Sequence, residues 1–255
     1  MPRPAVITLA TVSLWTVGGL WLDSHVGATG QLALGILTAC VLAALLVLQS
    51  PNVRFLAFGV VVIATVGEVV GSLIWGLYGY RLDNLPAFVP PGDGLVYLAG
   101  VSVATLCTTR SSALLVVASA LAGAWGLAGL FVLPATDVAG AIGCAFLLAV
   151  FAWTRQPVYA GVFLVVALLE LYGTALGTWT WESTVPGLGL SQGNPPSGVA
   201  SGYVVFDVLA LSLTACLRAS LGSKAKSPRF RRLFGCHGLA ELSRRACGPA
   251  SSPRP

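Results

Sequence analysis

Charged side chains are scarce in this sequence. Of its 255 residues only 9% are Asp, Glu, Lys or Arg, whereas 56% are hydrophobic. A soluble domain carries about 25% charged residues, so this composition excludes a water-soluble globular protein. The sequence also has 30 glycines and 15 prolines, two residues that are more frequent in transmembrane helices than in soluble ones. The composition therefore indicates a polytopic membrane protein.

Histidine and the common catalytic motifs are scarce as well. The two histidines, His25 and His237, lie outside the apolar runs. The sequence has no phosphate-binding loop, dinucleotide-binding glycine motif, HExxH zinc motif or catalytic Ser-His pair. We therefore expect no metal ion and no cofactor in the bundle.

Eight apolar stretches are candidates for membrane spans. About 20 mostly apolar residues cross the roughly 30 Å hydrocarbon core of a bilayer. The stretches cover residues 5–22, 31–49, 55–79, 94–109, 112–133, 138–153, 157–179 and 198–217. The fourth and sixth are short, so seven or six spans remain alternatives. The first could also be a signal peptide, although its apolar run is longer than the usual signal core.

The distribution of charge favours eight spans. With an even number of spans both termini share one side, and every Lys and Arg except Arg81 then falls on that side. The opposite side carries the remaining loop charges, Asp23, Asp83, Asp93, Asp137 and Glu182. Because Lys and Arg are enriched in cytoplasmic loops, we predict a multi-pass protein of the cell membrane with both termini in the cytoplasm.

The sequence contains an internal repeat. Residues 68–97 and 170–203 share an ordered series: Glu-x-x-Gly, a further glycine, aromatic-x-aromatic, a proline, a Pro-Pro pair, a glycine and a tyrosine. Such self-similarity marks repeated structural units. Each unit would hold four spans, an even number, so both would have the same orientation, related by an axis along the membrane normal. We predict an all-α transmembrane bundle of two parallel four-helix repeats, residues 1–110 and 111–222.

Three acidic residues lie deep inside predicted spans. Glu68, Glu170 and Asp207 are each about 10 residues from the outer end of a span, or roughly 15 Å deep. Ionisable residues at that depth face the bundle interior and by default mark functional sites. We assign the catalytic acids to these three residues and expect Glu68 and Glu170 to face each other or a shared cavity. The alternative is that each Glu only hydrogen-bonds a neighbouring Tyr or Trp and stabilises the bundle.

Aromatic residues follow both glutamates in the sequence. Tyr and Trp favour the headgroup level of a membrane, so these residues either form an interfacial belt or line a cavity above the acids. In the second interpretation they would stabilise a carbocation formed when a carbon–carbon double bond is protonated. Aromatic faces attract cations by about 0.5–2 kcal/mol. With one Asn from the second proline-rich loop, the residues assigned to substrate binding are Trp75, Tyr78, Tyr80, Trp179, Trp181 and Asn194.

Residues 223–255 form a separate basic segment in which apolar side chains alternate with cations. The segment is predicted to be either a short amphipathic helix on anionic lipid headgroups or a disordered tail. Its basic residues include Lys224, Lys226, Arg229, Arg231, Arg232, Arg244 and Arg245. The predicted partners are thus membrane lipids and, at this tail, anionic headgroups, with no nucleic acid.

Two patches of about 60 residues in total resemble a known family. Glu68-x-x-Gly71 followed by Gly76-x-Tyr78-x-Tyr80 and a proline-rich loop resembles the carotenoid hydratase-type membrane proteins of carotenoid biosynthesis. The later Trp179-x-Trp181 with Gly193-Asn194-Pro195 is similar to it as well, whereas residues 88–93 depart from the family pattern. The resemblance implies addition of water to the terminal double bond of a long isoprenoid within the bilayer, with Glu68 and Glu170 at the matching acidic positions.

Three functions remain open on these grounds. In the first, an intramembrane enzyme acts on an isoprenoid-like lipid: one protonated Glu donates to an alkene and the second carboxylate activates water. In the second, a proton-coupled transporter uses Glu68 and Glu170 as a relay between two four-helix halves. In the third, the chain is a structural membrane protein without catalytic activity.

Overall fold

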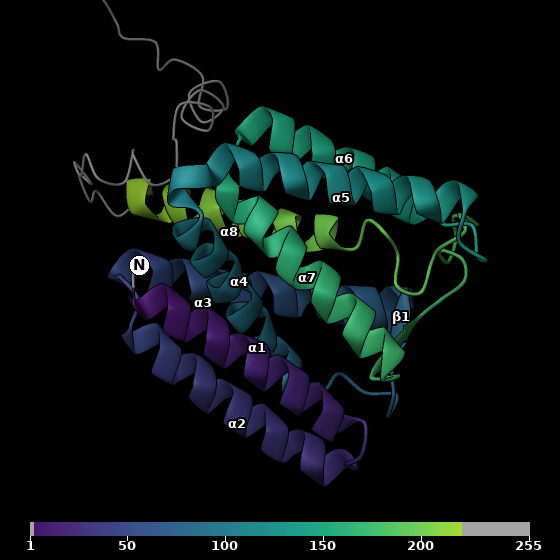
Figure 1. Ribbon diagram of the computed structural model, residues 1–255. Coiled ribbons are helices and arrows are strands. Elements are labelled where there is room, and N and C mark those ends of the chain that lie inside the picture. Colours follow the sequence, from purple (N-terminus) through teal and green to yellow (C-terminus); the bar gives the residue numbers. More distant parts are fainter. Residues whose placement is uncertain (1–2, 221–255) are drawn as a thin grey trace, which may run out of the picture. The chain divides into compact units, whose positions relative to one another are not determined.

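The computed structural model describes residues 3–220, with side chains up to residue 213. The basic segment at 223–255 and its predicted lipid contacts lie outside the described residues. Within the described part, eight α-helices form at the positions of the eight apolar stretches (Figure 1). They are α1 (Arg3–Asp23), α2 (Ala28–Val47), α3 (Pro51–Glu68), α4 (Val89–Leu106), α5 (Ser111–Phe131), α6 (Val138–Thr154), α7 (Pro157–Ala175) and α8 (Ala200–Ser220).

Five helical segments are long and apolar enough to cross a membrane, which makes the fold compatible with an integral membrane protein. They are Arg3–Asp23, Ala28–Val47, Pro51–Trp75, Thr108–Phe131 and Pro157–Ala175. Helix α6 and the described part of α8 are apolar but shorter. Helix α4 is not among the five, and it is the most enclosed helix, buried without interruption from Asp93 to Gly100. A span count of eight stays a prediction.

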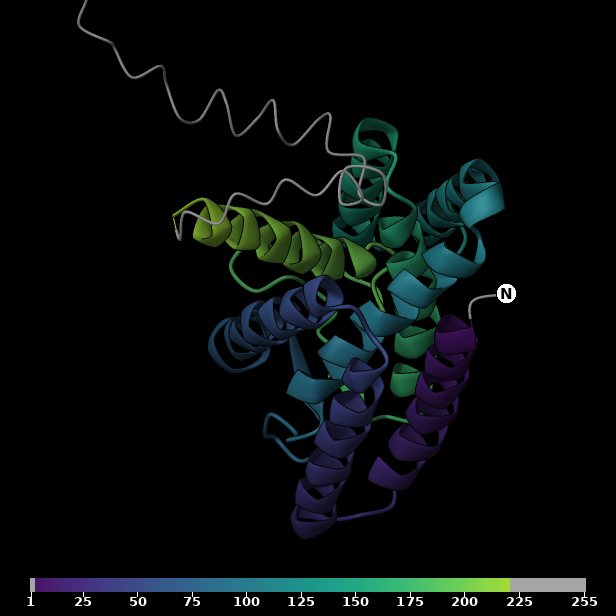
Figure 2. The same ribbon diagram turned by 90° about the vertical axis from the view of Figure 1, so that its left-hand side faces the viewer.

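The helices are arranged as two hairpins around a central group. Helices α1 and α2 lie together on one side and α5 and α6 on the other, with α3, α4, α7 and α8 between them (Figures 1 and 2). Helix α4 packs against α1, α2, α3 and α7, and α7 also packs against α5. Helices α4 and α7 are therefore the most enclosed, whereas α3 is about as exposed as the hairpin helices α2 and α5.

Helices α4 and α7 cross at a pair of glycines. A Cβ atom added to Gly100 would lie 2.9 Å from the backbone nitrogen of Val162, and one added to Gly161 would collide with the carbonyl oxygen of Gly100. Small residues let two helix backbones approach closely in membrane proteins. This crossing fixes α4 against α7, the helix that carries Glu170.

Helices α3 and α7 end in the same way, but the first does so with one extra residue. A π-helical segment, η1 (Val69–Trp75), continues α3 directly after Glu68. Gly76 then adopts the left-handed conformation with a φ of 72°, and Gly177 does so after α7 with a φ of 69°. Gly76 follows Glu68 by eight positions and Gly177 follows Glu170 by seven. A π-turn holds more residues than an α-turn, so η1 accommodates the extra residue.

A short two-stranded sheet follows these glycines, where the sequence analysis predicted helix and loop. Strands β1 (Tyr78–Tyr80) and β2 (Trp179–Trp181) are antiparallel neighbours. The predicted spans 55–79 and 157–179 were therefore too long at their ends. In both cases a glycine with positive φ ends the helix, a conformation that favours glycine and stops helix propagation.

Two buried aspartates attach the long connecting segments to the helical hairpins. Asp23, at the end of α1, accepts a hydrogen bond from Gln31 and forms an ion pair with Arg81 over 3.9 Å. Asp137, which caps α6, accepts hydrogen bonds from the backbone N–H groups of Gly193 at 2.9 Å and Ser197 at 2.6 Å. Each aspartate thus connects the loop of its own hairpin to the segment that follows the nearby strand.

Candidate functional site

Glu68 is held at the end of α3 by two phenol groups from β1. The hydroxyls of Tyr78 and Tyr80 both donate to Oε2 of Glu68, at 2.7 and 2.6 Å, and Glu68 is 5% exposed. Gly71 lies one turn further along the helix, where an added Cβ would sit 3.2 Å from the Tyr78 hydroxyl. The glycine of the Glu-x-x-Gly pattern therefore makes room for the ring that reaches back to the acid.

Glu170 is held on α7 by two indole groups from β2. The Nε1–H groups of Trp179 and Trp181 both donate to Oε2 of Glu170, at 2.9 and 3.1 Å, and Glu170 is 3% exposed. Here Gly173 makes the room, because an added Cβ would collide with the Trp179 ring. The two acids thus have the same arrangement of partners but different donors, hydroxyls for Glu68 and indole N–H groups for Glu170.

The sheet places all four donors on one face. The register pairs Tyr78 with Trp181, Gly79 with Thr180 and Tyr80 with Trp179. Successive strand residues point to opposite faces, so Gly79 and Thr180 are exposed while the aromatic rings turn inward. The Tyr78 and Trp181 ring centroids are 4.5 Å apart, and Tyr80 and Trp179 meet edge to face at 6.3 Å. The register is symmetric: the first residue of each strand pairs with the last residue of the other, and the two middle residues pair with each other.

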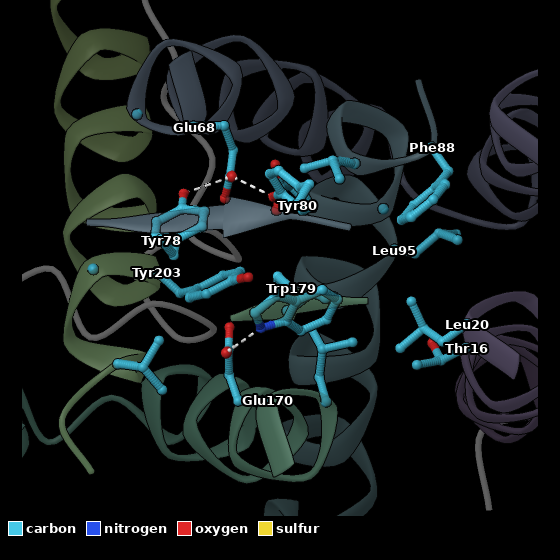
Figure 3. Close-up of a pocket in the computed structure, with 18 of the residues that line it drawn as sticks. Thr16, Leu20, Glu68, Tyr78, Tyr80, Phe88, Leu95, Glu170, Trp179 and Tyr203 are labelled. Carbon is cyan, nitrogen blue, oxygen red and sulfur yellow. Dashed lines mark hydrogen bonds between the residues drawn. The ribbon is translucent and has the colours of Figure 1, made fainter. Parts of the chain in front are cut away.

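Both glutamates line one cavity of about 220 Å³. Their carboxyl groups point into it from opposite sides, with the rings of Tyr78, Tyr203 and Trp179 between them (Figure 3). Away from the acids the cavity continues as an apolar arm. The residues that line this arm include Leu20, Leu34, Phe88, Val89, Leu95 and Val96. Among the residues that the structure describes, no Lys, Arg or His lines the cavity.

Asp93 is a third acid on the cavity, and its predicted position in an outer loop is wrong. Pro90, Pro91 and Gly92 before it favour a turn, which predicts a position in an outer loop. The structure instead begins α4 at Val89, so that Asp93 lies inside the helix and is 4% exposed. Proline is tolerated in the first turn of a helix, where its missing N–H has no intrahelical partner. The Pro-Pro pair was therefore a helix-start signal that could have identified this residue.

Three of the predicted site residues do not line the cavity. Asp207 is 3% exposed within the bundle, and its Oδ2 has no hydrogen-bond partner among the described residues. Trp75 is 45% exposed and donates to the carbonyl oxygen of Pro186, and the Asn194 side chain accepts from the Trp181 backbone N–H. Trp75 and Asn194 therefore hold the 180–197 segment beside the sheet. The roles predicted for these three residues stay predictions.

The phenols of the site remain protonated over an unusually wide pH range. Burial, and then the proximity of Glu68, raise the pKa of Tyr78 and of Tyr80 above that of a free phenol. Both hydroxyls can therefore act as hydrogen-bond donors to Glu68 across the physiological range. Indole N–H groups do not titrate there and can only donate.

Within residues 3–220 no group of three or more His, Cys, Asp or Glu side chains is arranged to hold a metal ion.

Comparison of the chain with protein-family models, with curated proteins and with solved structures found no match.

Proposed function

We propose that this chain is an intramembrane enzyme that adds water, or a proton, to a carbon–carbon double bond of an isoprenoid-like lipid in the cavity between Glu68 and Glu170. The observation that carries this proposal is the pair of buried carboxyl groups that point into one apolar, aromatic-lined cavity. Such a cavity accepts a hydrocarbon chain, and the two acids supply a proton donor and a proton acceptor. The resemblance to carotenoid hydratase-type proteins supports the same reaction class.

The different donors suggest different roles for the two acids. The indole N–H groups of Trp179 and Trp181 can only donate, so they stabilise the ionised form of Glu170. A tyrosine hydroxyl both donates and accepts, so Tyr78 and Tyr80 also accommodate a protonated Glu68. We therefore assign Glu68 as the general acid and Glu170 as the general base.

The reaction balances with these two groups alone. The π electrons of the alkene form a C–H bond with the proton of Glu68, which becomes a carboxylate, and the adjacent carbon becomes a carbocation. Water then attacks the cation, and Glu170 takes the proton that the water loses. Transfer of that proton from Glu170 to Glu68 across the cavity restores the starting state, and the net change is alkene plus water to alcohol.

The aromatic rings have a place in this reaction. A carbocation is attracted to aromatic faces by about 0.5–2 kcal/mol at each contact, and more strongly where water is excluded. Tyr78, Tyr80, Trp179, Trp181 and Tyr203 line the cavity around the two acids. They favour the charged intermediate over the neutral alkene, which is the condition for lowering the barrier.

We further propose that residues 1–110 and 111–222 are parallel repeats in the cell membrane, with eight spans and cytoplasmic termini. Two observations support the repeat. The register of β1 and β2 is symmetric, and each hairpin has a buried aspartate, Asp23 or Asp137, that binds the segment after the nearby strand. A proton-coupled transporter is the second candidate function. It is favoured by one observation, that the two acids come from corresponding helices of the two proposed repeats.

A lipid comparison tests the proposed reaction. Lipid extracts of a deletion strain are compared by mass with those of strains that express the unmodified chain, Glu68→Gln, Glu170→Gln or Glu182→Gln. Glu182 is the matched control because its side chain is exposed. We expect a lipid that lacks one water to accumulate in the deletion strain and in both site variants, but not with Glu182→Gln. Identical lipids in all strains would overturn the enzyme proposal.

A further inference from the structure

Three carboxyl groups share the cavity, and the described residues provide no basic side chain on its wall. Glu68 and Glu170 each accept two hydrogen bonds from aromatic donors. The third acid, Asp93, lines the same cavity. Each added negative charge in an apolar enclosure is unfavourable unless a cation or a proton compensates it.

Asp93 differs from the two glutamates in its partners. It is 4% exposed, and its Oδ2 atom has no hydrogen-bond partner among the described residues. A buried polar atom without a partner is rare in folded proteins and calls for an explanation such as a ligand or an ion. Because Asp93 also lines the cavity, a cationic ligand there would compensate its charge.

The rest of the wall defines the chemistry of that ligand. Aromatic rings surround the acids, and aromatic rings combined with carboxylates form the usual binding site for alkylated ammonium groups. The apolar arm extends from this polar end past Phe88 and Leu95 toward Leu20 of α1 (Figure 3). The cavity therefore has one end suited to a cationic head and another suited to a hydrocarbon chain.

We propose that the cavity binds an organic cation, a tertiary or quaternary ammonium group carried on an apolar chain, with Asp93 as the principal counter-ion. The ammonium head lies among Asp93, Glu68 and Glu170 against the aromatic rings, and the chain occupies the apolar arm. This inference rests on the charge and shape of the cavity and does not require the proposed hydration reaction.

Binding to the purified full-length protein in a non-ionic maltoside micelle tests this proposal. The probes are dodecyltrimethylammonium, the neutral dodecanol and the chain-free tetramethylammonium, and the readout is the fluorescence of the cavity tryptophans. We expect the ammonium amphiphile to bind about tenfold or more tighter than dodecanol. Tetramethylammonium should bind more weakly than the amphiphile, because it leaves the apolar arm empty; equal affinity would identify a free small ammonium compound as the ligand and overturn the chain requirement.

Two variants locate the counter-ion. Asp93→Asn should lower the affinity for the ammonium amphiphile about tenfold while leaving that for dodecanol nearly unchanged. Asp83→Asn, at an exposed position outside the cavity, is the control and should change neither. The comparison of charged and neutral probes on the unmodified protein needs no variant, so it remains decisive if Asp93→Asn does not fold.

The outcomes separate this inference from the proposed enzyme. Equal affinities of the unmodified protein for dodecyltrimethylammonium and dodecanol would overturn cation binding, whatever the lipid comparison shows. An unchanged preference for the ammonium probe in a folded Asp93→Asn variant would overturn the role of Asp93. Selective cation binding that depends on Asp93, with unaltered lipids in the deletion strain, would support this inference and reject the hydration reaction.

Discussion

The backbone N–H groups of Leu77 and Thr178 make corresponding hydrogen bonds, but Leu77 reaches back six residues to Gly71 and Thr178 only five to Gly173. The difference is the extra residue in the π-helical segment η1. After it, the two chains are again equivalent, since the Arg81 N–H donates to the Thr178 carbonyl and the Glu182 N–H donates to the Leu77 carbonyl, both at 3.0 Å. The π-helix thus keeps β1 in register with β2.

Deletion of Leu73 tests this explanation of the π-helix. Leu73 lies in η1 and is 55% exposed. Its removal gives α3 the same spacing from acid to glycine as α7, so we expect a folded protein whose Tm is close to that of the parent. The control deletion is Val62, which is 47% exposed in the α-helical part. Its removal turns the two parts of α3 about 100° relative to each other, and we expect a large loss of folded protein in size-exclusion chromatography. Equal effects of the two deletions would reject the explanation.

The glycine of each Glu-x-x-Gly pattern gives a second prediction. In Gly173→Ala the new Cβ would collide with the Trp179 ring, and overpacking of this kind costs about 1–3 kcal/mol. Thermal melting of the detergent-solubilised protein measures the loss. Gly18→Ala is the control, because nothing lies within 4 Å of its added Cβ. It should be neutral or stabilise α1, since alanine favours a helix by about 0.5–1 kcal/mol over glycine. A Gly173→Ala variant as stable as Gly18→Ala would contradict the packing argument.

The positions of the helices could be predicted from the sequence because apolar runs between polar breaks define them. The same runs predict a common depth for Glu68 and Glu170, and the structure brings both acids to one cavity. What could not be predicted was the sheet. Strands of three residues carry almost no periodic signal, and the pairing of β1 with β2 depends on contacts between distant parts of the chain.

The burial of Asp93 and the separate location of Asp207 show the limit of depth arguments. Linear position places an acid along the membrane normal but does not say which way its helix face turns. The prolines before Asp93 predict a loop in water, yet α4 packs against α1, α2, α3 and α7. Asp207 is buried in the bundle interior as predicted, but it does not line the cavity, although Tyr203, one turn earlier on α8, does.

Asp137 provides a prediction about the second proline-rich segment. Its Oδ1 accepts from the Gly140 and Gly193 N–H groups, and its Oδ2 accepts from Ser197 N–H. Asn at this position has one acceptor oxygen, and its NH₂ group would face a donor. We expect Asp137→Asn to lower stability by about 2 kcal/mol, the scale of hydrogen bonds to a charged group. Melting of this variant is compared with that of Asp83→Asn, an exposed acid that should have little effect. Equal Tm values for the two variants would contradict the anchoring role.

The proposed orientation predicts which loops are accessible from outside the cell. In a cysteine-free background, Ser183→Cys in the segment after β2 should react with a membrane-impermeant thiol reagent added to whole cells. Ser112→Cys at the start of α5 should react only after the membrane is opened. Both positions are exposed in the structure, so burial does not explain a difference. Labelling of Ser112→Cys from outside would reject the eight-span arrangement with cytoplasmic termini.

Substitutions of Glu170 distinguish catalysis from a purely structural role. Glu170→Gln retains an acceptor oxygen for the indole N–H groups of Trp179 and Trp181 but cannot exchange a proton. If Glu170 is the general base, this variant should melt near the parent temperature while the lipid product falls about 10²-fold or more. If Glu170 only stabilises the bundle, Gln should be nearly neutral in function. Glu170→Ala should lower stability by about 0.6–2 kcal/mol in either case.

The same changes at Glu68 and Asp207 complete the test. Glu68→Gln should lose activity as Glu170→Gln does, because a neutral amide cannot protonate an alkene. Asp207→Asn tests the third predicted acid, and because Asp207 does not line the cavity, we expect this variant to lose much less product than the two cavity variants. Loss of product only in Asp207→Asn would indicate that the reaction takes place near Asp207 and not in the cavity between Glu68 and Glu170. Full product in all three variants would leave proton transfer without a carrier, and the hydrogen bonds of Glu68 and Glu170 would then serve only to hold the sheet against the helices.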